Sequence, residues 1–346
     1  MSGIPPAAPS RLARLDGMRG LAALGVTLHH LFLHYAPWAG PGEAIAAWLR
    51  GWGWSLVDLF FVLSGYVFAH VYLPGGRLAG PQGLRDFALA RFARLYPLHL
   101  ATLLAVAAVM FGRPNNGPVE LGANLLMLQA VLHPFAQSFN QPSWSLSVEA
   151  FCYVVFALAA QAGRQRLLQV TAGAVAFSAL YLAALGRAEI ADAFPRGFLG
   201  FFAGQALWHL RARLAAVPAA ALAAALVLGC LIAFAPAMHG SSPALALSLL
   251  AWPAALLLAL RWPVMESRAM VWLGDRSYAI YLINLPLIFA AGAVLGHEGG
   301  IPVHLALLAA ILALSDLAWR FLEMPARRAI VAAGRAKGLG IRPQLG

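Results

Sequence analysis

Charged side chains are scarce in this sequence, and cysteine is almost absent. Only 11% of the 346 residues are charged, whereas 61% are hydrophobic. A soluble globular domain carries about 25% charged residues, so the composition excludes that class and indicates a polytopic membrane protein. The two cysteines, Cys152 and Cys230, both lie inside apolar runs, so no disulfide framework is implied. No bound metal is expected.

Acidic residues are also few. The sequence has 13 Asp and Glu residues and 24 Lys and Arg residues, which gives a net charge of +11. Such a surplus would indicate nucleic acid as a partner if the basic residues formed one stripe. Here the arginines separate apolar segments instead. We therefore expect the lipid bilayer as a partner and exclude nucleic acid.

The apolar segments are mostly near the ~20 residues that a membrane-spanning helix needs. We predict about ten of them, at residues 17–36, 54–73, 95–111, 144–162, 167–186, 195–210, 216–236, 242–260, 271–296 and 301–322. The run at 121–132 is shorter and is predicted to be interfacial or re-entrant. The sequence thus predicts an all-α, polytopic integral membrane protein with about ten transmembrane helices.

Arginines crowd alternate connections between these segments. Because basic residues favour the cytoplasmic side, this asymmetry places both termini in the cytoplasm. We divide the chain into a cytoplasmic N-terminal segment (1–15), a membrane-embedded domain (16–325) and a basic cytoplasmic tail (326–346). No removable signal peptide is expected. The expected location is a bacterial cytoplasmic (inner) membrane.

The first apolar segment carries ionisable residues where lipid would not tolerate them, which marks a functional site. On a helix, His30 lies within ~20° of Arg19 and ~16 Å deeper. One face therefore holds a fixed cation near the membrane rim and a proton acceptor near its middle. His34 lies close to the same face and is the second candidate base.

Two further arginines, Arg91 and Arg94, share a helix face at the start of the third apolar segment. Two adjacent guanidinium groups can bind a phosphate bidentately. The alternative is an ordinary positive-inside signal. Since Arg19 is predicted at the same membrane level, the three arginines could converge on one polyanion.

The most polar outer region precedes the fourth segment and includes Asn140 and Trp144. Glu149 follows about five residues into the descending helix, which places it ~8–10 Å below the outer surface, close to the depth of His30. A carboxylate at that depth could orient the imidazole and raise its basicity. The alternative is a structural carboxylate held by nearby serines. An acceptor hydroxyl is expected to enter around Asn140 and Trp144.

Other polar residues have mainly structural interpretations. Asp58, near the outer end of the second segment, is expected to be in contact with water. Ser64 and Gly65 indicate either close helix packing or a narrow passage against the first helix.

Polarity returns in the ninth segment with Tyr278 and Tyr281 on one face, followed by Asn284. In the last segment, Asp316 and Arg320 predict an i, i+4 pair, and Glu323 precedes a proline that is expected to end the helix.

Six motifs, taken in order, resemble the acyltransferase 3 family of integral membrane O-acyltransferases: RLDGMRGLAALGVTLHH, VDLFFVLSGYV, RFARLYP, WSLSVEAFCY, RSYAIYLINLP and WRFLEMP. The resemblance implies transfer of an acyl group, often acetyl, from cytoplasmic acyl-coenzyme A to a hydroxyl of a carbohydrate or glycoconjugate. No permanently bound cofactor is implied, because acyl-coenzyme A is a co-substrate.

The resemblance also carries over residue by residue. The family's Arg/His pair falls on Arg19 and His30, its RxxR motif on Arg91 and Arg94, and its glutamate on Glu149. The ninth-segment motif commonly ends in histidine, whereas this chain has Asn284, so a proton-transfer role there is not expected. The soluble esterase-like domain of some relatives is not seen, and the chain is expected to act alone on its acceptor.

The mechanism expected from these positions uses His30 as the base for an acceptor hydroxyl, with Glu149 orienting the ring. An acyl-histidine intermediate is the competing route. The acceptor site is expected to include Asn140, Trp144, Tyr278, Tyr281 and Asn284.

Two other classes fit parts of the sequence. Buried charges in a multi-helix membrane protein also suit a transporter or exporter of a polar solute or lipid-linked sugar, but the two similar halves typical of many transporters are not visible. A relative that has lost activity and serves as a scaffold is the third alternative. Retention of Arg19, His30 and Glu149 argues against it.

Overall fold

The computed structural model describes residues 11–35, 41–131, 136–186, 192–235, 243–296, 298 and 300–336. Every regular element within these ranges is helical, which confirms the all-α prediction. The predictions made for residues 1–10 and 337–346, the outer parts of the two terminal segments, lie outside the described residues.

The described chain is a succession of helices joined by short turns. Their bounds are α1 (Ala13–His34), α2 (Glu43–Trp52), α3 (Leu56–Tyr72), α4 (Gly80–Met110), α5 (Pro118–Leu125), α6 (Trp144–Gln161), α7 (Arg164–Ala184), α8 (Ala193–Leu214), α9 (Ala219–Phe234), α10 (Ala244–Ala246), α11 (Trp252–Ala259), α12 (Arg268–Leu295), α13 (Gly300–Ala318) and α14 (Met324–Ala336). Two π-helical turns, η7 (Leu247–Ala251) and η9 (Trp319–Glu323), join neighbouring helices without a break.

Each predicted apolar segment falls on a helix. Six helical stretches in the described part of the chain are long and apolar enough to cross a membrane, at Glu43–Tyr72, Gly80–Met110, Gln141–Gln161, Arg164–Ala184, Arg268–Leu295 and Gly300–Gly334. Helices α1 and α8 have 22 residues each, and α9 and the stretch Ala244–Ala259 are apolar but shorter. The chain is therefore a multi-pass membrane protein, and the count of about ten spans stays a prediction.

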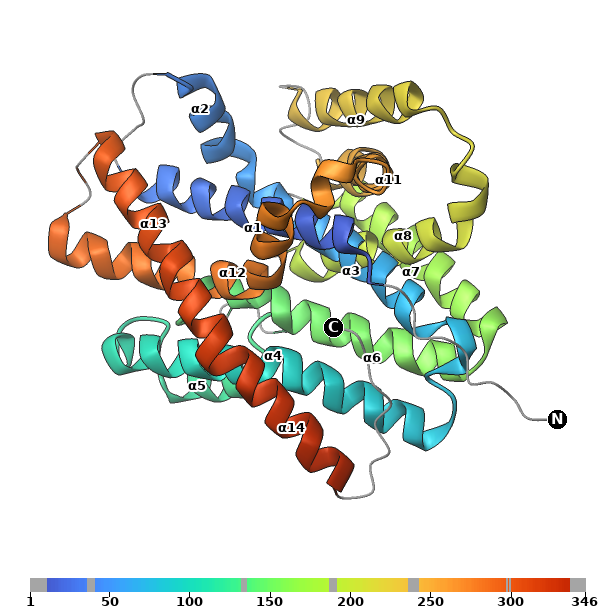
Figure 1. The fold of residues 1–346 in the computed structure, drawn as a ribbon, viewed down its shortest axis with the longest axis horizontal. Coiled ribbons are helices and arrows are strands. Elements are labelled where there is room, and N and C mark those ends of the chain that lie inside the picture. The colour runs from blue at the N-terminus through green and yellow to red at the C-terminus, as the bar shows by residue number, and fades with distance from the viewer. Residues whose placement is uncertain are drawn as a thin grey trace.

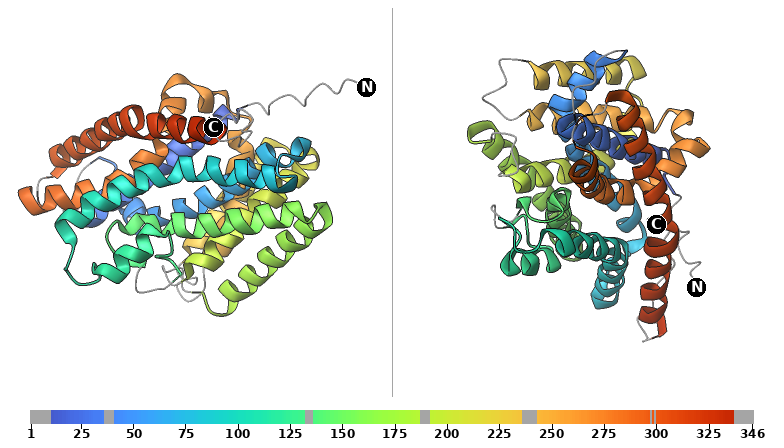
Figure 2. Two further views of the ribbon diagram at one scale, coloured as in Figure 1. Left: turned by 90° about the horizontal axis from the view of Figure 1, so that it is seen from below. Right: turned by 90° about the vertical axis from the view of Figure 1, so that its left-hand side faces the viewer.

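The long helices form one bundle with α1 near its centre (Figure 1). Seen from below, several long helices run roughly along one direction, as expected for a membrane bundle (Figure 2). Two elements differ from the sequence prediction. Helix α2 occupies residues 43–52, where only a connection was expected, and α4 begins at Gly80, well before the predicted residue 95.

Helices α1 and α12 share the most extensive contact among the described helices, and small residues make it. A Cβ added to Gly20 would lie 2.6 Å from the backbone nitrogen of Gly274, and one added to Gly274 would collide with the carbonyl of Asp16. Small residues let membrane helices approach closely, because apolar burial alone does not drive association in lipid. This contact fixes Arg19 and His30 relative to the polar stretch of α12.

Helices α3 and α8 are held together in the same way. Gly65 lies against the backbone of Phe201, and Gly204 lies against the carbonyl of Val62, so neither site has room for a side chain. The close-packing interpretation of Gly65 is confirmed, and its partner is α8. Its neighbour Ser64 is then turned away from α8 and lines a cavity.

The end of the last predicted segment corrects an expectation. Pro325 does not end the helix, because the π-helical turn η9 precedes it and α14 continues from Met324. The π-helical turn interrupts the regular i to i−4 hydrogen bonding just before Pro325, so a proline without an N–H is accommodated there inside a continuous helix. The predicted Asp316–Arg320 pair is present, with 2.9 Å between Oδ2 and Nε. Helices α13 and α14 form one long rod across the bundle (Figure 1).

Candidate active site

A cavity of about 170 Å³ lies between α1, α3, α4, α6, α12 and α14. An engineered cavity of about 150 Å³ holds benzene, so this space can hold a small organic group. Its polar lining consists of Arg11, Asp16, Arg19, Ser64, His70, Tyr72, Arg91, Arg94, Ser145, Glu149, Tyr153, Ser277, Tyr278, Tyr281 and Arg327. The structure thus brings together residues that lie more than 300 positions apart in the sequence.

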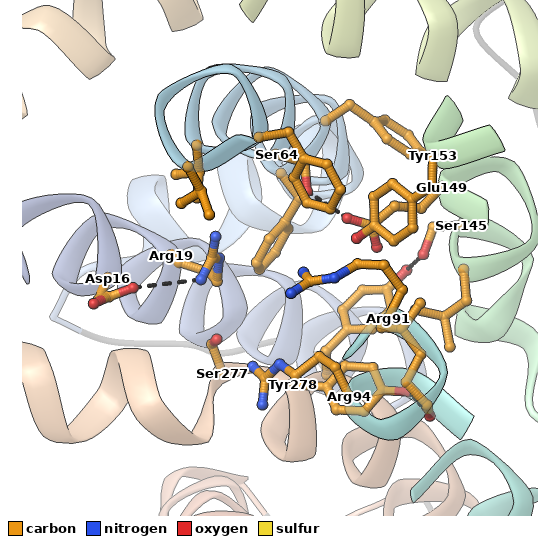
Figure 3. A pocket seen from close by; sticks show the side chains of 18 of the residues that line it. Asp16, Arg19, Ser64, Arg91, Arg94, Ser145, Glu149, Tyr153, Ser277 and Tyr278 are labelled. Carbon is orange, nitrogen blue, oxygen red and sulfur yellow. Dashed lines mark hydrogen bonds and ion pairs between the residues drawn. The ribbon is translucent and has the colours of Figure 1, made fainter. Parts of the chain in front are cut away.

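The three arginines that the sequence singled out all line this cavity. Figure 3 shows the guanidinium groups of Arg19, Arg91 and Arg94 pointing into the same space. They come from two helices, α1 and α4, that are far apart in the chain. The predicted convergence on one point is therefore present in the structure, while the ligand they bind stays a prediction.

The surroundings of Arg91 and Arg94 leave part of their charge available. The guanidinium of Arg94 pairs with Glu323 and lies 5.4 Å from the centre of the Tyr278 ring. The guanidinium of Arg91 lies 5.0 Å and 5.6 Å from the rings of Phe68 and Tyr72. The buried Nε of Arg91 has no hydrogen-bond partner within the described residues. Aromatic faces stabilise a guanidinium but do not neutralise it, so Arg91 can still attract an anion.

Carboxylates crowd the beginning of α1. Arg11 donates to Asp16 at 2.7 Å and to Asp275 at 2.5 Å, and Arg19 donates to Asp16 at 3.4 Å. Arg14 donates to Glu266, in the turn before α12, and this hydrogen bond lowers the pKa of the Glu266 carboxyl. These contacts hold the end of α1 against the connection into α12.

Glu149 lies in the part of the cavity between α3 and α6. The hydroxyl of Ser64 donates to its carboxylate (Figure 3). Close by, the Ser145 hydroxyl and the Tyr281 hydroxyl lie 2.8 Å apart, and Tyr281 also donates to the carbonyl of Pro142 at 2.8 Å. The Tyr278 hydroxyl donates to the carbonyl of Leu95 at 2.5 Å. Both predicted tyrosines therefore line the cavity with their hydroxyl groups already bound.

His30 is held outside the cavity lining by Asn284. The amide nitrogen of Asn284 donates to the carbonyls of Ile280 at 3.0 Å and Tyr281 at 2.8 Å, so its oxygen must face the ring. That oxygen lies 2.5 Å from Nδ1 of His30. Because an amide oxygen only accepts, Nδ1 carries the proton, and Nε2 keeps its lone pair as a potential base.

The expected contact between His30 and Glu149 is not present, and each residue has a different partner. Glu149 accepts from Ser64, whereas His30 donates to Asn284. The depth estimate could not reveal this difference, because it says nothing about which helices are neighbours. Helix α6 packs mainly against α7 and α8, while α1 packs mainly against α12.

The remaining predicted site residues are buried in the protein and do not line the cavity. The Asn140 amide donates to the carbonyl of Leu282 at 3.0 Å and to the Thr102 hydroxyl at 3.2 Å. The ring of Trp144 lies 6.2 Å from that of Phe61. Both side chains hold the start of α6 in place, and their predicted acceptor contacts are not tested by this structure.

Asp58 corrects another expectation, because it is completely buried rather than in contact with water. Its carboxylate pairs with Arg196 of α8 at 2.9 Å, and that guanidinium lies 4.6 Å from the Trp54 ring and 5.6 Å from the Trp144 ring. A buried charge needs such a partner. Arg196 lies at the start of the predicted segment 195–210, and nothing in its sequence pattern pointed to Asp58.

Two cavity arginines, Arg11 and Arg327, were not predicted as site residues. Arg327 follows Glu323 by four residues and so shares its helix face, which is the one signal that could have revealed it. Within the described residues, no group of three or more His, Cys, Asp or Glu side chains could hold a metal ion.

A bundle of membrane-length helices around an arginine-lined cavity defines a multi-pass membrane protein with one candidate site among the described residues. Comparison with known families makes this specific: residues 12–320 match the acyltransferase domain family, and the chain belongs to it. It is therefore a multi-pass membrane protein of the acyltransferase domain family. Within the described residues, every motif that carried the resemblance lies on the bundle or lines its cavity.

Several curated relatives are similar over parts of the chain. Protein 2 in the picA locus of Rhizobium radiobacter is 34% identical over 198 residues, covering 50% of this chain and 94% of that protein. Acyltransferase MdmB of Streptomyces mycarofaciens is 33% identical over 157 residues, which cover 43% of this chain and 39% of that protein. Peptidoglycan O-acetyltransferase OatA of Listeria monocytogenes is 25% identical over 358 residues, which cover 91% of this chain and 55% of that protein. The chain thus spans about half or less of the two relatives named as transferases. No solved structure matches it.

Proposed function

We propose that this protein transfers an acyl group, in particular acetyl, from cytoplasmic acyl-coenzyme A to a hydroxyl of a carbohydrate or glycoconjugate at or beyond the outer face of a bacterial inner membrane. The observation that carries the proposal is the convergence of Arg19, Arg91 and Arg94 on one cavity that also contains Glu149. Similarity to a peptidoglycan O-acetyltransferase supports both the acetyl group and the glycan acceptor.

In this proposal the three arginines bind the donor phosphates. Guanidinium groups bind phosphate oxygens bidentately, and three of them match a polyanion better than a single phosphate. With the phosphates there, the pantetheine arm extends along α1 and α12 toward Tyr281. Asn284 lies one helical turn further on, ~4.5 Å along the axis, and presents His30.

The tautomer of His30 determines which nitrogen accepts the proton in the reaction. Its Nε2 takes the proton of the acceptor hydroxyl, the oxygen attacks the thioester carbonyl, and the carbon–sulfur bond breaks to release coenzyme A as a thiolate. The proton on the imidazolium then passes to solvent or to the thiolate. Asn284 is a positioning residue that keeps Nε2 unprotonated before each turnover. A histidine-linked acyl intermediate remains the competing route.

Glu149 takes a different part from the one expected. Its hydrogen bond from Ser64 and its electrostatic interaction with Arg91 support a role for it inside the donor site. We assign it to holding these two groups in place. Substitution by glutamine should therefore disturb donor binding as well as turnover.

A prediction follows for Asn284. Replacing it by leucine removes the acceptor that fixes the His30 tautomer, and the rate of transfer should fall about tenfold or more, a part of what a positioned base contributes. Asn284→Asp keeps an acceptor oxygen and should retain most activity. Both variants should bind acyl-coenzyme A as the wild type does. If Asn284→Leu transfers acetyl at the normal rate with an unchanged pH profile, Asn284 does not position the base.

The proposed topology has about ten spans and both termini in the cytoplasm, as the arginine distribution favours. Reporter fusions after residues 113, 187 and 239 should give signals from the outer side; positions 187 and 239 lie outside the described residues. Cytoplasmic signals at two of the three positions would overturn this topology.

The proposed reaction is tested by mass spectrometry of surface glycans from cells with and without the gene. Loss of one defined acyl mass from one sugar is the expected result, and it would identify both the acyl group and the acceptor. Identical glycans, together with altered export of a lipid-linked sugar, would favour the transporter alternative instead.

A further inference from the structure

Arg327 on α14 lines the same cavity as the donor arginines but differs from them in its partners. Arg11 and Arg19 are paired with Asp16, and Arg94 is paired with Glu323. Within the described part of the chain, no hydrogen bond or ion pair joins Arg327 to a carboxylate. It interacts electrostatically with Arg91, another cation without a carboxylate hydrogen bond. A partly buried guanidinium beside a like charge is costly unless an anion joins it.

The position of Arg327 sets how far it lies from the acyl end. It follows Glu323 by four residues, so it is ~6 Å further along the helix than the residue that pairs with Arg94. Helix α14 packs along α4, and Tyr72, the last residue of α3, lines the cavity together with Arg327 and interacts with it electrostatically. Arg327 thus lies toward the end of α3 that Tyr72 forms, away from Tyr281 and His30.

Coenzyme A carries its negative charge in two places. The pyrophosphate joins pantetheine to adenosine, and a separate phosphate on the ribose 3′-hydroxyl is the anionic group most distant from the thioester. An elongated donor with its thioester near Tyr281 would present these groups in that order along the cavity. The outermost arginine without a carboxylate partner would then meet the outermost phosphate.

We propose that Arg327 of α14 binds the ribose 3′-phosphate of the donor, while Arg19, Arg91 and Arg94 bind its pyrophosphate. This inference rests on the proposed function, in which acyl-coenzyme A is the donor. It gives α14 a binding role. Because η9 continues into α14 without a break, one continuous helix pairs Glu323 with Arg94 and also places Arg327 at the cavity. The alternative is that Arg327 binds no ligand and is an ordinary positive charge on the cytoplasmic side.

The neighbouring Arg328 provides a matched control, because it is exposed and does not line the cavity. Substituting either arginine by alanine removes one positive charge from the same helix. The full-length protein, purified in lipid nanodiscs, would be tested for binding of acetyl-coenzyme A and of 3′-dephospho-acetyl-coenzyme A. The wild type should bind the first about tenfold more tightly, since a charged hydrogen bond to phosphate is lost with the second.

Arg327→Ala should abolish this preference by weakening only the binding of acetyl-coenzyme A, whereas Arg328→Ala should keep it. The inference is wrong if Arg327→Ala keeps the preference, if Arg328→Ala loses it equally, or if the wild type binds both compounds alike. In each of these cases the donor assignment survives, because both compounds still bind. A wild type that binds neither compound overturns the inference and the proposed function together.

Discussion

Replacing His30 by alanine should abolish acyl transfer while leaving donor binding unchanged. The reason is the separation seen in the structure: the arginines line the cavity, whereas His30 does not line it and lies beside Asn284, one helical turn beyond Tyr281 on α12. A positioned general base contributes about 10²–10⁴ in rate. Removing it should lower turnover by that factor and should not disturb groups that bind the donor phosphates.

The experiment compares His30→Ala with His34→Ala, since both histidines lie on α1 and His34 lies one turn further along. Acetyl transfer and acyl-coenzyme A binding are measured on the same purified preparations, and a monodisperse elution profile shows that each variant is folded. The His34 variant should remain active. Folded His30→Ala protein that acylates at the normal rate would place the base elsewhere, with His34 the next candidate.

The second large effect is expected for donor binding. Substituting both Arg91 and Arg94 by alanine should weaken acyl-coenzyme A binding about a hundredfold or more, because two charged hydrogen bonds to phosphate are lost. Isothermal titration with the purified protein measures this directly. Lysine at both positions should restore binding only in part, since an ammonium keeps the charge but lacks the fork of a guanidinium.

The ion pair between Arg94 and Glu323 dictates the control. Removing Arg94 alone leaves a buried carboxylate without its partner, which could weaken the fold instead of the site. Glu323→Gln is therefore combined with the double variant and also made by itself. Unchanged donor binding in the folded triple variant would show that Arg91 and Arg94 do not bind the donor and serve only as a positive-inside signal.

Helix positions and the depth of polar groups could be predicted from the sequence, because both follow from the regular rise of a helix and the thickness of a bilayer. Each apolar segment lies on a helix, and Arg19, Arg91 and Arg94 meet as their shared level suggested. The sequence does not predict helix α2, because its residues 43–52 are too few for a span.

Lateral contacts could not be predicted, because equal depth does not say which helices touch. Glu149 and His30 were placed at one level, yet α12 supplies the partner of His30 and α3 supplies that of Glu149. Asp58 and Arg196 are 138 positions apart and form a buried pair for the same reason. The place of Arg327 at the cavity had a local signal, because it follows Glu323, the last residue of η9, by four residues and so shares its helix face.

The most direct test of the account uses sealed inside-out membrane vesicles that contain the protein and its glycan acceptor. Radiolabelled acetyl-coenzyme A, which cannot cross the bilayer, is supplied to the exposed cytoplasmic face. Label should enter glycan inside the vesicles, and none should enter with His30→Ala protein. Label that reaches glycan only after the vesicles are permeabilised, or equally in His30→Ala vesicles, would contradict transfer through the arginine-lined cavity to a base at His30.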